Sequence, residues 1–308
     1  MKEHLELDPT VEQLLKDYDE QKSVLVQDYL DHPEKLSTFM DFRVDYAFRY
    51  ILGHKPILLK LINDTLPVEV SDIEYLPNEI PVISAKEKRS VFDVICTAKH
   101  TEEKFVTEMQ YIPDVDMDDR LLYYGCSLVH RQIERGNSLY RLKPIYVLCI
   151  ANYLRMHATD VGSEHFFFQY QFREATAPKD VFTKNLQFFF LELPRLTKIW
   201  DSLETNLERW CYLFGNLRNF AEVPENQAGF EDVFKVARTG ELQGEELKKY
   251  VVSMLEEYTV YTTTEYARRE GYKEEKEDVA KAMFSNGMDV QTISKLTGLS
   301  EEAVSALK

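Results

Sequence analysis

Polar side chains interrupt two apolar, strand-forming runs near the middle of the chain. Asp93 lies in the apolar run 91–95, where a lone charge is costly unless another group compensates it. Glu108 and Gln110 lie in the run 105–110, which is otherwise apolar or rich in strand-forming residues. Because side chains alternate along a strand, Glu108 and Gln110 are expected on one face. If the two runs pair through the polar turn between them, D-x14-E-x-Q becomes one constellation.

Such a constellation suits phosphodiester hydrolysis. A hard divalent cation such as Mg²⁺, for which Mn²⁺ substitutes, binds carboxylate and carbonyl oxygens, polarises a phosphate and activates water. We therefore predict that Asp93, Glu108 and Gln110 are catalytic and that Asp93 and Glu108 ligate the metal. If the strands do not pair, the simpler interpretation holds: an Asp that caps a turn and a Glu-x-Gln on an exposed strand face.

The order of the surrounding elements predicts an α/β fold with a mixed central sheet flanked by helices. Three strand-like runs, at 72–76, 90–98 and 104–112, are expected to form an antiparallel meander. A helix pair at 42–66, broken by Gly53 and Pro56, precedes them. The other expected elements are a helix at 119–135, strands at 140–154, 165–172 and 186–193, and a helix at 203–217.

Composition and periodicity predict four regions along the chain. They are N-terminal accessory helices at 1–40, the main domain at 41–220, a charged helical region at 221–278 and a small helix-turn-helix-like tail at 279–308. The last helix of the tail offers Glu301 and Glu302 rather than the Arg, Lys, Asn or Gln that read bases. That composition favours packing or self-association of the tail over DNA binding.

The net charge of -16 argues against a phosphate-rich partner for the surface as a whole. Most of it is local, because residues 1–40 carry ten acids and four bases, and residues 221–278 carry fifteen acids and eight bases. The stretch 79–143 is nearly neutral, with eleven acids and ten bases. Any DNA-facing surface is therefore expected there. No apolar run approaches a membrane span and the N-terminus is acidic, so we expect a cytoplasmic protein.

Six segments, in this order and spacing, resemble the PD-(D/E)XK nuclease family transposases, which are related to the Rpn recombination-promoting nucleases. The resemblance covers most of residues 41–220 and is carried by VDYAFRYILG at 44–53, LLKLINDTL at 58–66, FDVIC at 92–96, TEMQY at 107–111, DRLLYYGCSLVHRQIERGNSLYRLKPIYVLCI at 119–150 and FFFLELPRL at 188–196. It implies a restriction-endonuclease-like core, Mg²⁺-dependent cleavage of DNA, and association with mobile elements, transposition or recombination.

The resemblance also implies roles for individual residues. Asp93 would be the strand acid, Glu108 the acid of the (D/E)xK motif, and Gln110 would replace the usual lysine, as is common in this family. A lysine brings a positive charge, whereas glutamine only orients water or offers its carbonyl oxygen. Asp45 matches a further metal-binding acid, although an ion pair with Arg49 at i+4 explains it equally well.

Basic residues after the two strands could hold the DNA backbone. Arg120 matches the arginine that follows the ExQ motif in the family and is the first candidate, followed by Arg131 and Arg135. For the latter two, a solvated surface is an equally good explanation.

The leading interpretation is thus a Mg²⁺-dependent DNA endonuclease that uses metal-activated water, and cutting both strands would require two active sites and hence a homodimer. The alternative is a catalytically inactive protein of nuclease fold that binds DNA or a protein. An RNA-cleaving toxin would use the same site.

Overall fold

The computed structural model describes residues 9–80, 90–133, 139–155, 162 and 165–307. Contacts divide the chain into two compact units, Met1–Glu257 and Tyr258–Lys308. The first unit contains both expected acidic strands and the whole sheet. The second contains most of the C-terminal helical residues.

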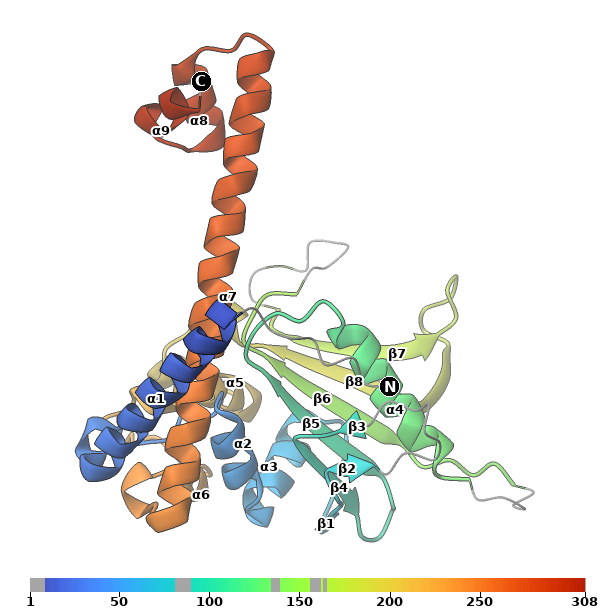
Figure 1. Ribbon diagram of the computed structural model, residues 1–308. Coiled ribbons are helices and arrows are strands. Elements are labelled where there is room, and N and C mark those ends of the chain that lie inside the picture. The colour runs from blue at the N-terminus through green and yellow to red at the C-terminus, as the bar shows by residue number, and fades with distance from the viewer. Residues whose placement is uncertain (1–8, 81–89, 134–138, 156–161, 163–164, 308) are drawn as a thin grey trace. The chain divides into compact units, whose positions relative to one another are not determined.

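A mixed six-stranded sheet forms the centre of the first unit (Figure 1). Its strand order is β1-β4-β5-β6-β8-β7, with parallel pairing at β5–β6 and β6–β8 and antiparallel pairing elsewhere. A separate pair of two-residue strands, β2 and β3, is antiparallel. The strands are β1 (Ile73–Tyr75), β2 (Glu79–Ile80), β3 (Ser90–Val91), β4 (Val94–Ala98), β5 (Lys104–Gln110), β6 (Ile145–Ala151), β7 (Phe167–Arg173) and β8 (Val181–Glu192).

Helices flank this sheet and continue into the second unit, which confirms the predicted α/β class. They are α1 (Pro9–Asp31), α2 (Asp45–Leu52), α3 (Lys55–Thr65), α4 (Met117–His130), α5 (Asn206–Asn216), α6 (Glu231–Val236), α7 (Gly244–Ser285), α8 (Val290–Thr297) and α9 (Glu301–Ala306). Short 3-10 turns lie at Pro33–Lys35, Leu193–Arg195, Trp200–Ser202, Leu217–Asn219 and Thr239–Glu241. Within the described residues, no helix is both long enough and apolar enough to cross a bilayer.

The predicted antiparallel meander is present as β1-β4-β5, but the expected single strand at 90–98 is wrong. The chain bends at Asp93, so β3 ends at Val91 and pairs with β2, whereas β4 begins at Val94 and pairs with β5. The bend is held by Asn78, whose side-chain amide donates to the backbone carbonyl of Asp93 at 3.0 Å. The acid therefore lies at a strand break, where its backbone N–H donates to a side chain, Glu108, instead of to a ladder carbonyl.

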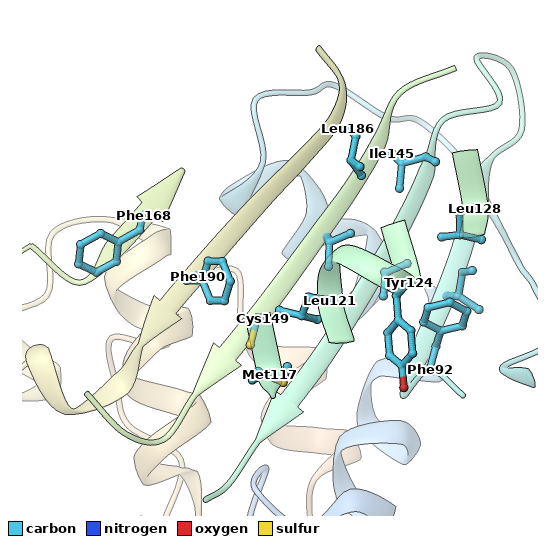
Figure 2. Close-up of a cluster of buried hydrophobic side chains, with 13 residues drawn as sticks. Phe92, Met117, Leu121, Tyr124, Leu128, Ile145, Cys149, Phe168, Leu186 and Phe190 are labelled. Atoms are coloured by element: carbon cyan, nitrogen blue, oxygen red, sulfur yellow. The ribbon is translucent and has the colours of Figure 1, made fainter. Parts of the chain in front are cut away.

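Helix α4 covers the sheet face that carries the even-numbered residues of β5. Its Leu121, Tyr124 and Leu128 pack on sheet residues such as Ile145 and Cys149 in one buried cluster (Figure 2). Gly125 permits this close approach, because a Cβ there would lie 2.7 Å from a methyl group of Leu186. The burial of these apolar side chains fixes α4, and with it the residues of its first turns.

The helix pair at 42–66 is confirmed as α2 and α3, and its two predicted breakers act differently. Gly53 ends α2, whereas Pro56 lies in the first turn of α3, where the missing N–H has no helical partner to lose. In the charged region, the expected set of helices includes one long helix instead of several short ones. α7 runs for 42 residues and passes the predicted boundary at 278, because it contains no Pro and its one internal Gly, Gly271, does not end it.

Candidate active site

The register of β4 and β5 brings Asp93 and Glu108 together. Val94 of β4 pairs with Thr107 of β5. Asp93, just before β4, therefore faces Glu108. The backbone N–H of Asp93 donates to Glu108 Oε1 at 3.3 Å, and the N–H of Met109 donates to Asp93 Oδ2 at 2.8 Å. The Glu108 residue is 4% exposed and the Asp93 side chain is 16% exposed. Two carboxylates therefore share a confined space, as the sequence predicted.

The electrostatics of this pair favour protonation or a bound cation. Burial raises the pKa of Glu108 well above its usual value, and the neighbouring charge of Asp93 raises it further. Burial likewise raises the pKa of Asp93, with a contribution from Asp45 that the Met109 N–H and Arg49 only partly offset. Two buried carboxylates with raised pKa values lack sufficient positive charge around them, which is a common property of functional sites.

Helix α2 contributes an arginine to the same site. Arg49 Nη2 donates to Asp93 Oδ1 at 3.2 Å, and its Nε lies 2.9 Å from Asp45 Oδ1. The guanidinium thus bridges the two acids, and the i, i+4 ion pair that explained Asp45 without a metal is present. Asp45 is 43% exposed at its side chain, unlike the enclosed Glu108. The structure therefore places Asp45 beside the pair, but with Arg49 between it and Asp93.

Gln110 is held by the first turn of α4. Arg120 Nη2 donates to Gln110 Oε1 at 2.7 Å, while its Nη1 lies 2.9 Å from Asp114 Oδ2. The charge of Arg120 also acts to lower the pKa of Glu108. The side-chain carbonyl of Gln110 is thus occupied by Arg120, and the guanidinium is directed at the site rather than at a separate surface. In this position Arg120 brings the positive charge that glutamine lacks.

Arg131, the second arginine expected to bind DNA, does not join this cluster. Arg131 caps the C-terminus of α4, and eleven helical residues at 1.5 Å each put its backbone about 16 Å from that of Arg120. Its side chain belongs to an exposed residue. Arg135 lies outside the described residues.

One acid that approaches the site was not predicted. Glu257 of α7 has its pKa raised to about 7, chiefly by burial, and the charges of Asp45 and Asp93 add to the shift. The sequence pattern assigned this residue to a solvated, charged helix. A sequence signal existed, because the apolar Val251 and Met254 lie three residues apart, as on one face of a helix, and the structure buries both.

The fit of a divalent cation depends on the donor set. Among the described residues, no three His, Cys, Asp or Glu side chains are gathered closely enough to form a ready-made metal site. Mg²⁺, however, keeps several waters and is commonly held by one or two carboxylates. Asp93 and Glu108 supply two, and their raised pKa values reflect a deficit of positive charge that a cation would remove. The residues present therefore fit a hydrated cation bound by this pair.

Comparison with known proteins gives two matches to family models. Residues 273–308 match the C-terminal HTH domain of the Rpn/YhgA-like nuclease family, which agrees with the helix-turn-helix-like pattern of the tail. No curated protein and no solved structure shows significant similarity to the chain. Residues 42–267, well over half of the chain, match the model of the PD-(D/E)XK nuclease family transposases. With Asp93, Glu108 and Gln110 inside the matched region, the chain belongs to the PD-(D/E)XK nuclease family transposases.

Proposed function

We propose that this chain is a metal-dependent DNA endonuclease that hydrolyses phosphodiester bonds during transposition or recombination. The observation that carries the proposal is the meeting of Asp93 and Glu108 in one enclosed, under-compensated site. Membership of a nuclease family and an HTH domain supports nucleic acid as the partner. HTH domains commonly place a helix in the DNA major groove, although Glu301 and Glu302 of α9 would repel phosphates.

Asp93 and Glu108 would hold Mg²⁺, with Mn²⁺ as a substitute. When bound, the cation would polarise the scissile phosphate and lower the pKa of water. Asp93 is fixed for this role by the Met109 N–H and by Arg49. Asp45 is a weaker candidate ligand, because it would need Arg49 to move from between the two acids.

Arg120 would act together with Gln110. Its guanidinium holds the amide oxygen of Gln110, which would leave the amide nitrogen as a donor for water or a phosphate oxygen. The fixed positive charge of Arg120 beside Glu108 would stabilise negative charge that develops on the phosphate. Within the proposal, this pair of residues replaces the usual lysine. Arg131 and Arg135 would contact the backbone of flanking DNA.

The test is plasmid nicking by the full chain with Mg²⁺ or Mn²⁺, compared with EDTA. Asp93→Asn and Glu108→Gln keep the side-chain shapes and should each lower the nicking rate by at least about 100-fold. Lys179→Ala, a change in an exposed residue outside the site, is the control for preparation quality. Nicking that survives both substitutions would contradict the site. An RNA substrate in parallel distinguishes a ribonuclease from a deoxyribonuclease.

A second candidate is an inactive member of the fold that binds DNA or protein. The observation in its favour is Arg49, whose guanidinium pairs with both Asp93 and Asp45, where a cation would otherwise be expected. It predicts DNA binding that Mg²⁺ does not strengthen and no nicking under any metal condition. Cutting of both strands, in contrast, would call for a dimer with two copies of the site.

A further inference from the structure

A groove is lined by α2 and by the part of α7 that belongs to the first unit. Its volume is about 650 Å³. Ser253 of α7 accepts a hydrogen bond from the backbone N–H of Tyr46 at 3.2 Å, which ties the two walls together. Asp45 and Arg49 line the groove and also contact or adjoin Asp93, so the groove opens next to the candidate active site.

The α2 wall presents an aromatic stack. Tyr46 and Tyr50 are one helical turn apart, and their ring centroids are 5.7 Å apart with an interplanar angle of 23°. Both residues are half-buried and line the groove. Burial raises the pKa of Tyr46 to about 12, so its hydroxyl stays protonated and can donate to a phosphate oxygen. Aromatic rings of this kind are stacking platforms for the bases of single strands.

The α7 wall presents two lysines. Lys248 and Lys249 are exposed, and among the described residues neither takes part in an ion pair or hydrogen bond. The acids of the groove are mostly neutralised, because Glu256 pairs with Lys22 and Asp45 pairs with Arg49. Glu245 is the remaining acid of the lining. Lys248 and Lys249 against Glu245 leave one net positive charge among these lining residues, while Glu246, outside the lining, acts by its negative charge on both tyrosines.

We propose that this groove binds a single-stranded segment of the DNA next to the scissile phosphate, with bases on Tyr46 and Tyr50 and phosphates at Lys248 and Lys249. A volume of about 650 Å³ suits one or two nucleotides, since pockets for small ligands span roughly 300–1,000 Å³. A space for one or two nucleotides does not admit a duplex, which has two paired strands. This inference rests on the proposed function and adds a preference to it: DNA with a branched, frayed or overhanging end is bound more tightly than an intact duplex.

The test measures binding of fluorescent DNA to the full chain carrying Glu108→Gln, so that cleavage does not consume the probe. The probes are one duplex with an oligothymidylate overhang and the same duplex with blunt ends. The background protein should bind the overhang duplex about tenfold or more tightly than the blunt duplex. The double variant Lys248→Ala/Lys249→Ala should weaken overhang binding about tenfold and reduce the salt slope by about 1.4, at roughly 0.7 for each phosphate contact.

Two further variants make the test specific. Tyr50→Ala should weaken overhang binding at least about fivefold, as expected for the loss of one stacked base. The matched control, Lys179→Ala/Lys184→Ala, removes the same charge from exposed residues near β7 and β8 and should change overhang binding less than about twofold. Photocrosslinking of an overhang that contains 5-iodouracil should label Tyr46 or Tyr50.

The outcomes separate this inference from the proposed function. Equal affinity of the Lys248→Ala/Lys249→Ala variant and its control, or crosslinks that map away from α2 and α7, would overturn the groove while leaving plasmid nicking untouched. Displacement of the overhang by free thymidine monophosphate at a similar concentration would also overturn it, because the groove would then be a mononucleotide site. Strand binding by a wild-type chain that never nicks DNA would support the groove and contradict the nuclease.

Discussion

Two buried acidic sites of this molecule differ in how much positive charge surrounds their carboxylates. Asp41, just before α2, is 2% exposed and is fully compensated: Arg43 binds both of its carboxylate oxygens, at 2.9 and 2.8 Å, and Arg218 lies 3.4 Å away. Burial alone would raise the pKa of Asp41, but the hydrogen bonds and charges of the arginines outweigh it and lower the pKa.

The pair of Asp93 and Glu108 is left under-compensated. It has two carboxylates instead of one, a 3.2 Å hydrogen bond from Arg49 to Asp93, and Arg120 engaged by Gln110 and Asp114. Both carboxylates have raised pKa values as a result. Balanced charge at Asp41 stabilises the fold. The shortage of positive charge around Asp93 and Glu108 instead lowers stability and favours a bound cation, as in a functional site.

The largest expected effect is on stability, at the compensated site. Asp41→Asn leaves Arg43 and Arg218 facing a neutral amide in a buried place, and should lower the free energy of unfolding by about 3 kcal/mol. Urea unfolding followed by circular dichroism measures it. Asp118→Asn, which removes an exposed partner of Arg155, is the control and should cost less than about 1 kcal/mol. An Asp41 variant as stable as that control would show that the comparison is wrong.

The second effect is on catalysis and concerns Arg120. Arg120→Gln removes a positive charge beside Glu108 and releases Gln110, and should lower the nicking rate about 10- to 100-fold. Arg120→Lys keeps the charge and should recover part of that loss. If Arg120 served only to bind flanking DNA, both variants would raise the DNA concentration needed for half-maximal rate and leave the maximal rate unchanged.

The acid pair was predictable from sequence because its geometry is local. Side-chain alternation on β5 and a short antiparallel connection to β4 suffice to bring Glu108 opposite Asp93. The i, i+4 spacing likewise predicted the contact of Asp45 with Arg49. The bend at Asp93 was not predictable, since it depends on Asn78 and on the pairing of β3 with β2.

The contribution of α7 could not be predicted for a different reason. Glu257 and Lys248 follow the acidic strands by more than a hundred residues, and the helical period of α7 reveals that one side is buried without revealing its partner. The packing of Tyr250 and Ser253 against the residues around α2 decides that partner: the Tyr250 hydroxyl accepts from the Asp41 N–H, and Ser253 accepts from that of Tyr46. Tertiary packing thus supplied the groove and brought the charge of Glu257 within reach of Asp45 and Asp93.

A third, smaller effect is a gain in stability, in contrast to the loss expected for Asp41→Asn. Glu108→Gln removes a buried acid whose pKa burial and Asp93 raise well above its usual value, so the metal-free variant should be more stable than wild type by about 1–2 kcal/mol in EDTA at neutral pH. Added Mg²⁺ should raise the Tm of wild type, because a ligand of the native state stabilises it, but should not raise the Tm of the variant. A Glu108 variant that is destabilised and still responds to Mg²⁺ would place the cation elsewhere.

The smallest expected effect concerns Glu257 and depends on pH. Burial, with the charges of Asp45, Asp93 and Glu256, raises the pKa of Glu257 from about 4.5 to about 7, so the native state binds this proton more tightly than the unfolded chain does. Stability contributed by the group is therefore present below about pH 4.5 and is lost as the pH rises through about 7. Glu257→Gln abolishes that dependence.

Because the Glu257 side chain is partly exposed, we expect the variant to gain at most about 1 kcal/mol over wild type at pH 8.5 and nearly nothing at pH 5. Thermal unfolding in EDTA at the two pH values measures the difference, with Glu256→Gln, whose carboxylate is exposed and pairs with Lys22, as the neighbouring control. An equal gain in stability at both pH values would mean that Asp45 and Asp93 do not influence Glu257. The shortage of positive charge would then be confined to Asp93 and Glu108.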